Sequence, residues 1–257
     1  MARALLRPLL RRINGFGMRS RRDADRIQAL GADPRRVRVT GNVKFDSLDL
    51  STPLPSAGQD QWNCWASDPV IVAGSTFAGE EELLVGIFRE LRADFARLRM
   101  ILAPRHLERI GAVEGLLRSA GEEYRLFSRL TPATGECSLV ILDRMGVLSD
   151  LYRKASVVFV GRSLRGSGGQ NPIEPAAAGK PILFGPHMEN FSEIAGELVE
   201  AGGAIRVEDE NRLAARISEI LADPKRGKLM GNRARAVVAR KQGATRRNLE
   251  MIRELLE

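Results

Sequence analysis

The sequence has few of the residues on which several common classes of protein depend. Its 257 residues include only two cysteines, two tryptophans and two tyrosines. Cys64 and Cys137 lack the spacing of metal ligands, and so low a cysteine content predicts a reducing, cytoplasmic environment. No apolar run approaches the roughly 20 residues that cross a bilayer. Arginines interrupt the segment 1–17 too often for a signal peptide, and the scarce aromatic side chains argue against stacking on single-stranded nucleic acid.

Positive charge is concentrated at the two ends of the chain. Residues 1–40 hold 11 arginines and three aspartates, and residues 223–257 hold ten basic and four acidic side chains. The formal net charge is +8, so the segment between the two ends is mildly acidic. Such ends attract a polyanion, either an anionic membrane surface or nucleic acid. Two solvated helices explain the same pattern, and the charge alone leaves these interpretations open.

Short apolar runs alternate with amphipathic stretches over residues 64–224. The stretches 80–95 and 105–121 have the period of helices. The apolar runs are four to six residues long and rich in Val, Ile and Leu, which is typical of strands buried on both faces of a parallel sheet. These runs are 69–74, 99–104, 138–143, 156–161, 180–185 and 204–207. The alternation predicts an α/β fold with a Rossmann-like, doubly wound parallel sheet.

The remaining segments suggest the domain organisation. Residues 20–33 predict a helix that Gly31 ends, and residues 37–41 predict one more strand. Residues 51–63 are rich in Pro, Ser, Gly and Gln and predict a linker. The predicted organisation is a first part over 1–50, the linker 51–63, the sheet domain over 64–224 and basic C-terminal helices over 225–257.

The candidate ligand-binding residues lie at or beyond the ends of the predicted strands. Open parallel sheets bind their ligands beyond the carboxyl ends of the strands, so these residues are expected to meet on one edge. The candidates are Ser75, Thr76, Arg105, His106, Met145, Gly146, Val147, Gly168, Gly169, Asn171, Pro172, Ile173, Glu174 and His187. Both histidines of the chain, His106 and His187, are among them.

The segment 166–181, GSGGQNPIEPAAAGKP, is the most informative one. Asn171, Pro172 and Glu174 fit the N-cap, N1 and N3 positions of a helix, and a capping box accounts for them locally. A glycine-rich loop before a helix also presents backbone N–H groups to a phosphate. Glu174, one turn into the helix, is placed to accept hydrogen bonds from ribose hydroxyls. The segment therefore predicts nucleotide binding, although it matches neither the Walker nor the dinucleotide fingerprint.

Three other candidate residues also have structural explanations. Arg105 follows Pro104, which marks a strand end, and its guanidinium fits a phosphate or is simply exposed at a helix start. Ser75 and Thr76 bind a ligand, or they cap the helix that begins near Gly79.

His187 and Lys44 can also be explained without any functional role. His187, in the tripeptide GPH, is a ligand contact or a histidine of the core or rim. Lys44, in GNVKFD, is an isolated lysine of the kind usually found on a surface. Neither residue predicts a function on its own.

Six segments, taken in order, resemble the C-terminal half of the 3-deoxy-D-manno-octulosonic acid (Kdo) transferases of lipopolysaccharide synthesis. They are TGNVKFD (40–46), VAGSTFAGEEE (72–82), LAPRHLER (102–109), LDRMGVL (142–148), FVGRSLRGSGGQNPIEPAA (159–177) and GPHMENF (185–191). The resemblance implies an inverting glycosyltransferase of the GT-B fold, with two Rossmann-like domains facing each other across a cleft. It implies transfer of Kdo from CMP-Kdo to a lipid A precursor without a metal or other cofactor. The implied location is peripheral, on the cytoplasmic face of the inner membrane, with no nucleic-acid partner.

The resemblance also implies roles for single residues. It assigns the contacts to CMP to Pro104, Arg105, Met145, Gly146, Val147, Asn171, Pro172, Ile173 and Glu174. Lys44 matches a lysine that stabilises charge in the transition state. Ser75, Thr76, His106, Gly168, Gly169 and His187 are possible further contacts. The sequence departs from the family at Phe77 and Gln170, where His is common, and at Val147, where a polar residue is usual.

Length is the largest departure from the family. Family members carry an N-terminal acceptor domain that is largely absent from this sequence. The resemblance implies that residues 1–50 are a remnant of that domain and that the glutamate acting as general base belongs to the absent part. The 257 residues alone are therefore expected to bind CMP without transferring Kdo. The alternatives are a CMP-sugar-binding fragment without turnover and another GT-B nucleotide-sugar enzyme, such as a UDP-sugar transferase or epimerase.

Overall fold

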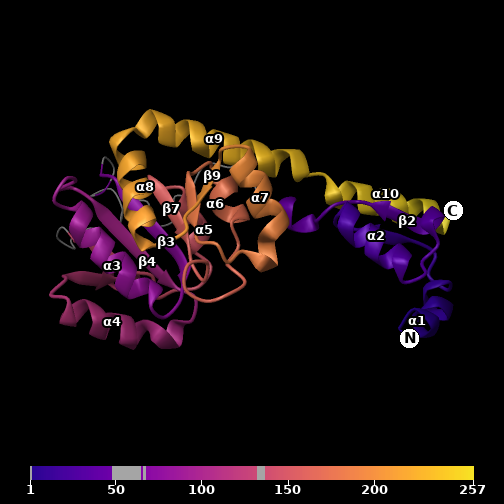
Figure 1. Cartoon of the computed structure of the whole chain (residues 1–257), viewed down its shortest axis with the longest axis horizontal. Coiled ribbons are helices and arrows are strands. Elements are labelled where there is room, and N and C mark those ends of the chain that lie inside the picture. The colour runs from indigo at the N-terminus through magenta and orange to yellow at the C-terminus, as the bar shows by residue number, and fades with distance from the viewer. Residues whose placement is uncertain (1, 48–64, 66–67, 132–136) are drawn as a thin grey trace. The chain divides into compact units, whose positions relative to one another are not determined.

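The computed structural model describes residues 2–47, 65, 68–131 and 137–257 (Figure 1). The chain forms two compact units: unit 1 comprises Met1–Leu50 and Val238–Glu257, and unit 2 comprises Ser51–Val237. The predicted linker 51–63 lies outside the described residues. Among the helices in the described part of the chain, none is long and apolar enough to span a membrane.

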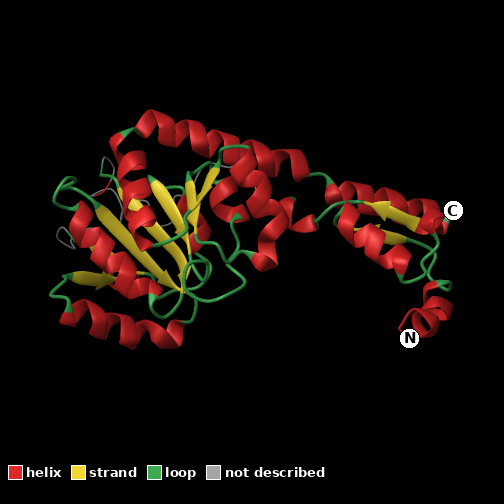
Figure 2. Cartoon of the chain, in the orientation of Figure 1, coloured by secondary structure: helices red, strands yellow, loops and turns green. Residues whose placement is uncertain are grey.

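Unit 2 is built on a parallel sheet of seven strands (Figure 2). The strands are β3 (Val70–Thr76), β4 (Arg99–Pro104), β5 (Tyr124–Leu126), β6 (Leu139–Ile141), β7 (Val157–Val160), β8 (Ile182–Phe184) and β9 (Ala204–Arg206). Their order is β5-β6-β4-β3-β7-β8-β9, so the chain leaves the central strand β3 first in one direction and then in the other. The order reverses between β3 and β7, which is the place where doubly wound sheets bind ligands.

The helices of unit 2 connect the strands and bury apolar faces on them. They are α3 (Glu80–Leu91), α4 (Ile110–Ser119), α5 (Leu148–Tyr152), α6 (Ile173–Ala177), α7 (Ser192–Glu200), α8 (Glu210–Ala222) and, up to Val237, α9 (Pro224–Lys241). One apolar cluster joins the strands to Phe88 on α3, Leu117 on α4 and Ile217 on α8. Single 3-10 turns lie at Leu107–Arg109, Phe127–Arg129 and Glu189–Phe191.

Unit 1 contains a short βαβ motif. Strands β1 (Phe16–Met18) and β2 (Val37–Val39) pair in parallel, and α2 (Arg21–Ala29) lies between them in the chain. The side chain of Ser20 accepts a hydrogen bond from the N–H of Asp23 and so caps α2. The unit also contains α1 (Ala2–Leu10), α10 (Ala244–Leu256) and 3-10 turns at Pro34–Arg36 and Val43–Phe45. Polar contacts join α10 to the loop after β2, for example from Arg247 Nε to the carbonyl of Thr40 at 2.8 Å.

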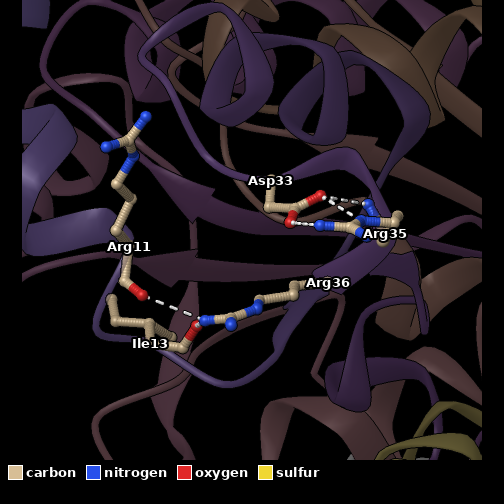
Figure 3. A network of polar contacts seen from close by, with 5 residues as sticks. All are labelled: Arg11, Ile13, Asp33, Arg35 and Arg36. Carbon is tan, nitrogen blue, oxygen red and sulfur yellow. Dashed lines mark hydrogen bonds and ion pairs between the residues drawn. The ribbon is translucent and has the colours of Figure 1, made fainter.

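An arginine holds the segment that follows α1 (Figure 3). Nη1 of Arg36 donates hydrogen bonds of 3.0 Å to the carbonyl oxygens of both Arg11 and Ile13. The neighbouring Arg35 pairs instead with Asp33, at 2.8 Å. A single guanidinium thus satisfies two carbonyl groups beyond the end of a helix, where intrahelical partners are missing.

The predicted strands are confirmed, because every apolar run named above coincides with a strand of the sheet to within two residues at either end, and 37–41 contains β2. The pattern missed β1 and β5, which have three residues each. The basic C-terminal segment predicted to be helical forms two helices, because α9 ends at Lys241 and α10 begins at Ala244. Gly243 separates them with a φ of 89°, a left-handed conformation that glycine adopts readily.

Candidate functional site

The predicted site residues of unit 2 gather on the carboxyl edge of the sheet. Parallel strands all end on the same edge, so the loops after β3, β4, β6, β7 and β8 lie there together. Every candidate residue of the sequence analysis except Lys44 lies at one of these strand ends, in the loop that follows it, or at the start of α6. Lys44 lies in unit 1, on the 3-10 turn Val43–Phe45, with an exposed side chain.

Arg105, Asn171 and Glu174 form a polar group on this edge. Nδ2 of Asn171 donates to Oε1 of Glu174 at 3.2 Å, while its Oδ1 accepts from the N–H of Ile173 at 3.0 Å. Burial raises the pKa of the Glu174 carboxyl, and the hydrogen bond from Asn171 and the charge of Arg105 offset this only in part. The carboxyl is thus partly dehydrated yet close to a cation, and it is suited to accept hydrogen bonds from neutral hydroxyl groups.

The helix start differs slightly from the prediction. Helix α6 begins at Ile173 with Pro172 in the N-cap position, one residue later than the capping-box pattern predicts. Asn171 nevertheless caps the turn through its side chain, because its Oδ1 accepts the N–H of Ile173. Pro172 and Ile173 are buried and act as structural supports for the polar residues on either side.

Tyr152 is a polar residue of this region that the sequence analysis missed. Its side chain is 3% exposed, and a Cβ placed on Gly74 would lie 2.0 Å from its hydroxyl oxygen. Burial and the nearby charge of Glu174 raise the pKa of Tyr152, so the hydroxyl stays protonated at neutral pH. The only sequence signal was Gly74 at the end of an apolar run, where a close approach needs a residue without a side chain.

The last residue of β3 directs its hydroxyl into the protein. Thr76 is buried and its Oγ1 donates to Oε1 of Glu81 at 3.1 Å, and Glu81 pairs with Arg109 at 3.0 Å. Helix α3 has Gly79 at its N-cap with no side-chain cap, so Ser75 does not cap this helix and neither does Thr76. The Thr76 hydroxyl therefore has a partner within the protein, and its contact to a ligand stays a prediction.

The glycine-rich loop also directs two of its N–H groups to the protein. Gly168 donates to Oε2 of Glu189 at 2.6 Å, and Gly169 donates to the carbonyl of Arg162 at 3.1 Å. Nδ1 of His187 lies 3.4 Å from the other oxygen of Glu189. This corrects the expectation that the amides of Gly168 and Gly169 are presented to a phosphate, since both have acceptors in the fold.

Phe77 lies between two cationic or titratable side chains. Its ring meets the ring of His106 edge-on at 5.4 Å between centroids, and the guanidinium of Arg162 lies 5.1 Å from its centroid. Such cation–π and edge-on contacts orient all three side chains. Phe77 thus connects the loops after β3, β4 and β7.

The remaining candidates lie on the loops after β4 and β6. Pro104 is buried as the last residue of β4, and the next N–H, that of Arg105, donates to the carbonyl of Thr76 at 3.0 Å. Met145 is 61% exposed, and Gly146 has a φ of 83°. Val147 precedes α5 directly. The described residues include no group of three or more His, Cys, Asp or Glu side chains placed to hold a metal ion.

Two families of known proteins match parts of the chain. Residues 1–47 match the family described as 3-Deoxy-D-manno-octulosonic-acid transferase (kdotransferase). Residues 136–237 match the family described as Glycosyl transferases group 1. The second match covers the strands from β6 to β9 and the glycine-rich loop between them.

Individual relatives agree with the family matches. The chain is 34% identical over 236 residues to a 3-deoxy-D-manno-octulosonic acid transferase of Haemophilus influenzae, covering 90% of this chain and 55% of the relative. The C-terminal CMP-Kdo binding domain of WaaA from Acinetobacter baumannii matches with a TM-score of 0.65 and 25% identity, over 71% of this chain and 95% of that domain.

A more distant structure shares the fold alone. Anabaena HepE in complex with UDP-glucose is 14% identical, with a TM-score of 0.54 over 98% of this chain and 66% of that chain. Unit 2 has the Rossmann-like fold of a GT-B glycosyltransferase domain. The chain spans about half the length of the curated relatives it matches, 55% in the Haemophilus influenzae protein. By sequence and by fold, the chain is similar to part of the 3-deoxy-D-manno-octulosonic acid transferases.

Proposed function

We propose that unit 2 binds CMP-Kdo on the carboxyl edge of its sheet and that the protein takes part in Kdo transfer to a lipid A precursor. The observation that carries the proposal is the match over 95% of a CMP-Kdo binding domain, at 25% identity. Relatives named as Kdo transferases and the match of residues 1–47 to the kdotransferase family support it. In this proposal the donor binds to the polar group formed by Arg105, Asn171 and Glu174.

In this proposal each group has a distinct task. The exposed guanidinium of Arg105 pairs with the phosphate of CMP, to which a planar fork of donors is well suited. The Glu174 carboxylate, oriented by Asn171, accepts hydrogen bonds from the ribose hydroxyls. Met145, Gly146 and Val147 supply exposed apolar surface and backbone groups on the neighbouring loop. Lys44, in unit 1, stabilises negative charge that develops during transfer.

The proposed transfer is inverting and uses no metal ion or other cofactor. The acceptor hydroxyl must lose its proton to a general base within about 3 Å. By resemblance that base is a glutamate of an acceptor domain, and no residue of unit 2 is assigned the role. Donor binding and transfer can therefore be measured separately. Donor binding is the activity proposed for unit 2 alone.

A binding experiment with two variants tests the donor site. Titration calorimetry of the chain with CMP is expected to show binding, and UMP is expected to bind more weakly. Arg105→Ala is expected to weaken CMP binding by roughly 10- to 100-fold, because a charge-assisted hydrogen bond to phosphate is lost. Arg118→Ala, which changes another exposed arginine on the helix that follows the same strand, is the matched control.

Three results would contradict this proposal. One is the absence of CMP binding by a folded chain. Another is equal affinity for CMP and UMP, which favours a different nucleotide-sugar enzyme of the GT-B class. An equal loss of affinity in Arg105→Ala and Arg118→Ala would remove Arg105 from the site.

For access to the lipid acceptor, we propose that the protein binds to an anionic membrane surface. Unit 1 exposes large apolar side chains on α10, among them Leu249 at 52% and Ile252 at 48%. Exposed arginines accompany them, for example Arg246 at 78%. Apolar groups beside cations fit the boundary of an anionic leaflet. Binding to vesicles is expected to rise with anionic lipid and to fall with salt, and equal partition onto neutral vesicles would contradict it.

A further inference from the structure

One buried carboxylate joins the loops after β3 and β7. Glu80, the first residue of α3, is 0% exposed. Its Oε2 accepts the N–H of Phe77 at 3.0 Å and that of Arg162 at 2.7 Å. Its Oε1 accepts the N–H groups of Ser163 at 3.0 Å and Leu164 at 3.2 Å. The carboxylate therefore sits in a concave row of backbone donors.

Such a row of successive N–H groups is the geometry that proteins use to bind anions. Here the anion is a side chain of the protein itself. A buried carboxylate without partners is costly, and several charge-assisted hydrogen bonds offset that cost. The contact therefore fixes the backbone of residues 162–164 relative to the start of α3.

Backbone strain lies at the same place. Ser75 and Arg162 have φ values of 56° and 55°, which are unusual for residues other than glycine. Ser75 is the next-to-last residue of β3, and Arg162 lies two residues beyond the end of the adjacent strand β7. A Cβ placed on Gly161 would lie 2.4 Å from the carbonyl oxygen of Ser75, so the two strand ends touch. Strained residues persist only where surrounding contacts hold them, and Glu80 holds the N–H of Arg162.

Ser163 extends the contact to a third loop. Its buried Oγ donates to the carbonyl of Val160 and accepts the N–H of Gly185 at 2.9 Å. Its carbonyl accepts the N–H of His187 at 3.0 Å. The hydrogen bonds of Glu80 therefore fix a segment to which the loop after β8 is also attached.

We infer that Glu80 is a positioning residue for the donor site. By fixing residues 162–164, it sets the path of the chain through the glycine-rich loop to Asn171 and Glu174. The inference rests on the proposed function, because it assumes that this edge of the sheet binds the donor. Glu80 touches backbone donors only, and no ligand contact is assigned to it.

The neighbouring Glu81 provides a matched control. It is also buried, at 2% exposure, and belongs to the same turn of α3. Its carboxylate contacts Thr76 and Arg109 and none of the backbone donors of the loop after β7. A change at Glu81 therefore removes a buried charge without releasing that loop.

The experiment compares Glu80→Gln with Glu81→Gln in the full chain. Gln keeps the size of Glu but replaces one acceptor oxygen with a donor group, which opposes the N–H groups. We expect Glu80→Gln to speed amide hydrogen exchange at residues 162–165 without ligand and to weaken CMP binding by roughly 5- to 100-fold. Glu81→Gln is expected to lower the thermal midpoint, with loop exchange and CMP affinity unchanged.

Several outcomes would overturn the inference. One is a folded Glu80→Gln chain with unchanged exchange at 162–165 and unchanged CMP affinity. Another is a loss of affinity in both variants that follows only their loss of stability. If Glu80→Gln does not fold, Glu80→Asp, which keeps the charge on a shorter side chain, serves instead, with the same two readouts. A wild-type chain that does not bind CMP overturns the proposed function, and loop exchange alone then decides the role of Glu80.

Discussion

Different kinds of interaction stabilise the interior of each of the two units. In unit 2 the strands β4, β6, β7 and β8 are buried along their length, and large side chains such as Phe88, Phe159 and Phe184 are at most 1% exposed. In unit 1 the buried apolar residues include small ones such as Ala24 and Ala244. Large apolar side chains of unit 1 that are exposed are Leu9, Ile13, Val39, Val43, Leu249, Ile252, Leu255 and Leu256.

Polar contacts take the place of a large core in unit 1. Asp46 accepts N–H groups at the start of α10, Arg247 binds the carbonyl of Thr40, and Arg36 binds two carbonyls after α1 (Figure 3). Apolar burial depends little on salt and pH, whereas ionic and charge-assisted contacts depend on both. The two units should therefore respond differently to the same change in salt, pH or sequence.

The largest effect is expected from truncating a core side chain of unit 2. Phe159→Ala on β7 removes a side chain that is 1% exposed and leaves a cavity beside the central strand. Loss of such a phenylalanine typically costs about 3–5 kcal/mol in the free energy of unfolding. Urea denaturation at low and high salt measures it. A cost that changes strongly with salt would contradict the view that unit 2 rests on apolar burial.

A smaller effect is expected from Glu174→Gln on the edge of unit 2. Burial raises the pKa of Glu174, so its ionised form is less stable in the fold than in the unfolded chain. This unfavourable contribution is absent below the ordinary pKa and appears as pH rises through the folded pKa. The variant should therefore be slightly more stable than wild type at neutral pH. CMP binding should fall by roughly 5- to 100-fold, because ribose hydroxyls lose a charged acceptor.

Thermal unfolding and calorimetry at neutral pH measure both parts of this prediction. Glu108→Gln, an exposed glutamate on the loop after β4, is the control for a general loss of negative charge. If Glu174→Gln lowers stability and leaves CMP affinity unchanged, Glu174 is a structural cap rather than a ligand contact.

The sequence predicted the sheet of unit 2 well because the relevant signal is local. Strands buried on both faces need continuous apolar runs, and β4 was predicted with both of its bounds. Strand β1, with the sequence FGM, and β5, with YRL, carry no such run. Their pairing depends on neighbouring segments that a short window does not contain.

The polar contacts of the candidate site were harder to predict, because their partners are distant in sequence. Glu80 accepts N–H groups from residues 82 to 85 positions away, which a local sequence pattern cannot show. The glycines of the loop after β7 were recognised, but the acceptor of the Gly168 N–H is Glu189, 21 residues later. Composition identified the loop, and the fold determines which groups its amides meet.

A still smaller effect is expected at Asp46, which joins α10 to the rest of unit 1. Burial tends to raise the pKa of Asp46, but hydrogen bonds from Thr245 and Gly243 outweigh it, so the pKa is lowered. The stabilisation is therefore fully present above the ordinary pKa of 3.8 and is lost as pH falls through the lower folded pKa. Asp46→Asn should cost about 0.5–2 kcal/mol, the usual range for a helix cap.

Amide hydrogen exchange along α10 measures this change within unit 1. In wild type, exchange relative to the intrinsic rate should increase below about pH 4. In Asp46→Asn the protection should already be reduced at neutral pH and should change little on acidification. Equal pH dependence in wild type and variant would show that Asp46 does not attach α10.

The smallest effect is expected from the surface ion pair between Arg38 on β2 and Glu254 on α10. The charged atoms are 2.6 Å apart, but both side chains are more than half exposed, at 53% and 55%. Exposed pairs contribute about 0–1 kcal/mol, and salt screens them. Arg38→Ala should therefore reduce the protection of α10 amides slightly at low salt and not at all at about 1 M salt, where the Debye length is roughly 3 Å. A loss of protection that persists at high salt would mean that the stem of Arg38 contributes packing, and the contrast between a polar unit 1 and an apolar unit 2 would then be weaker than the charges suggest.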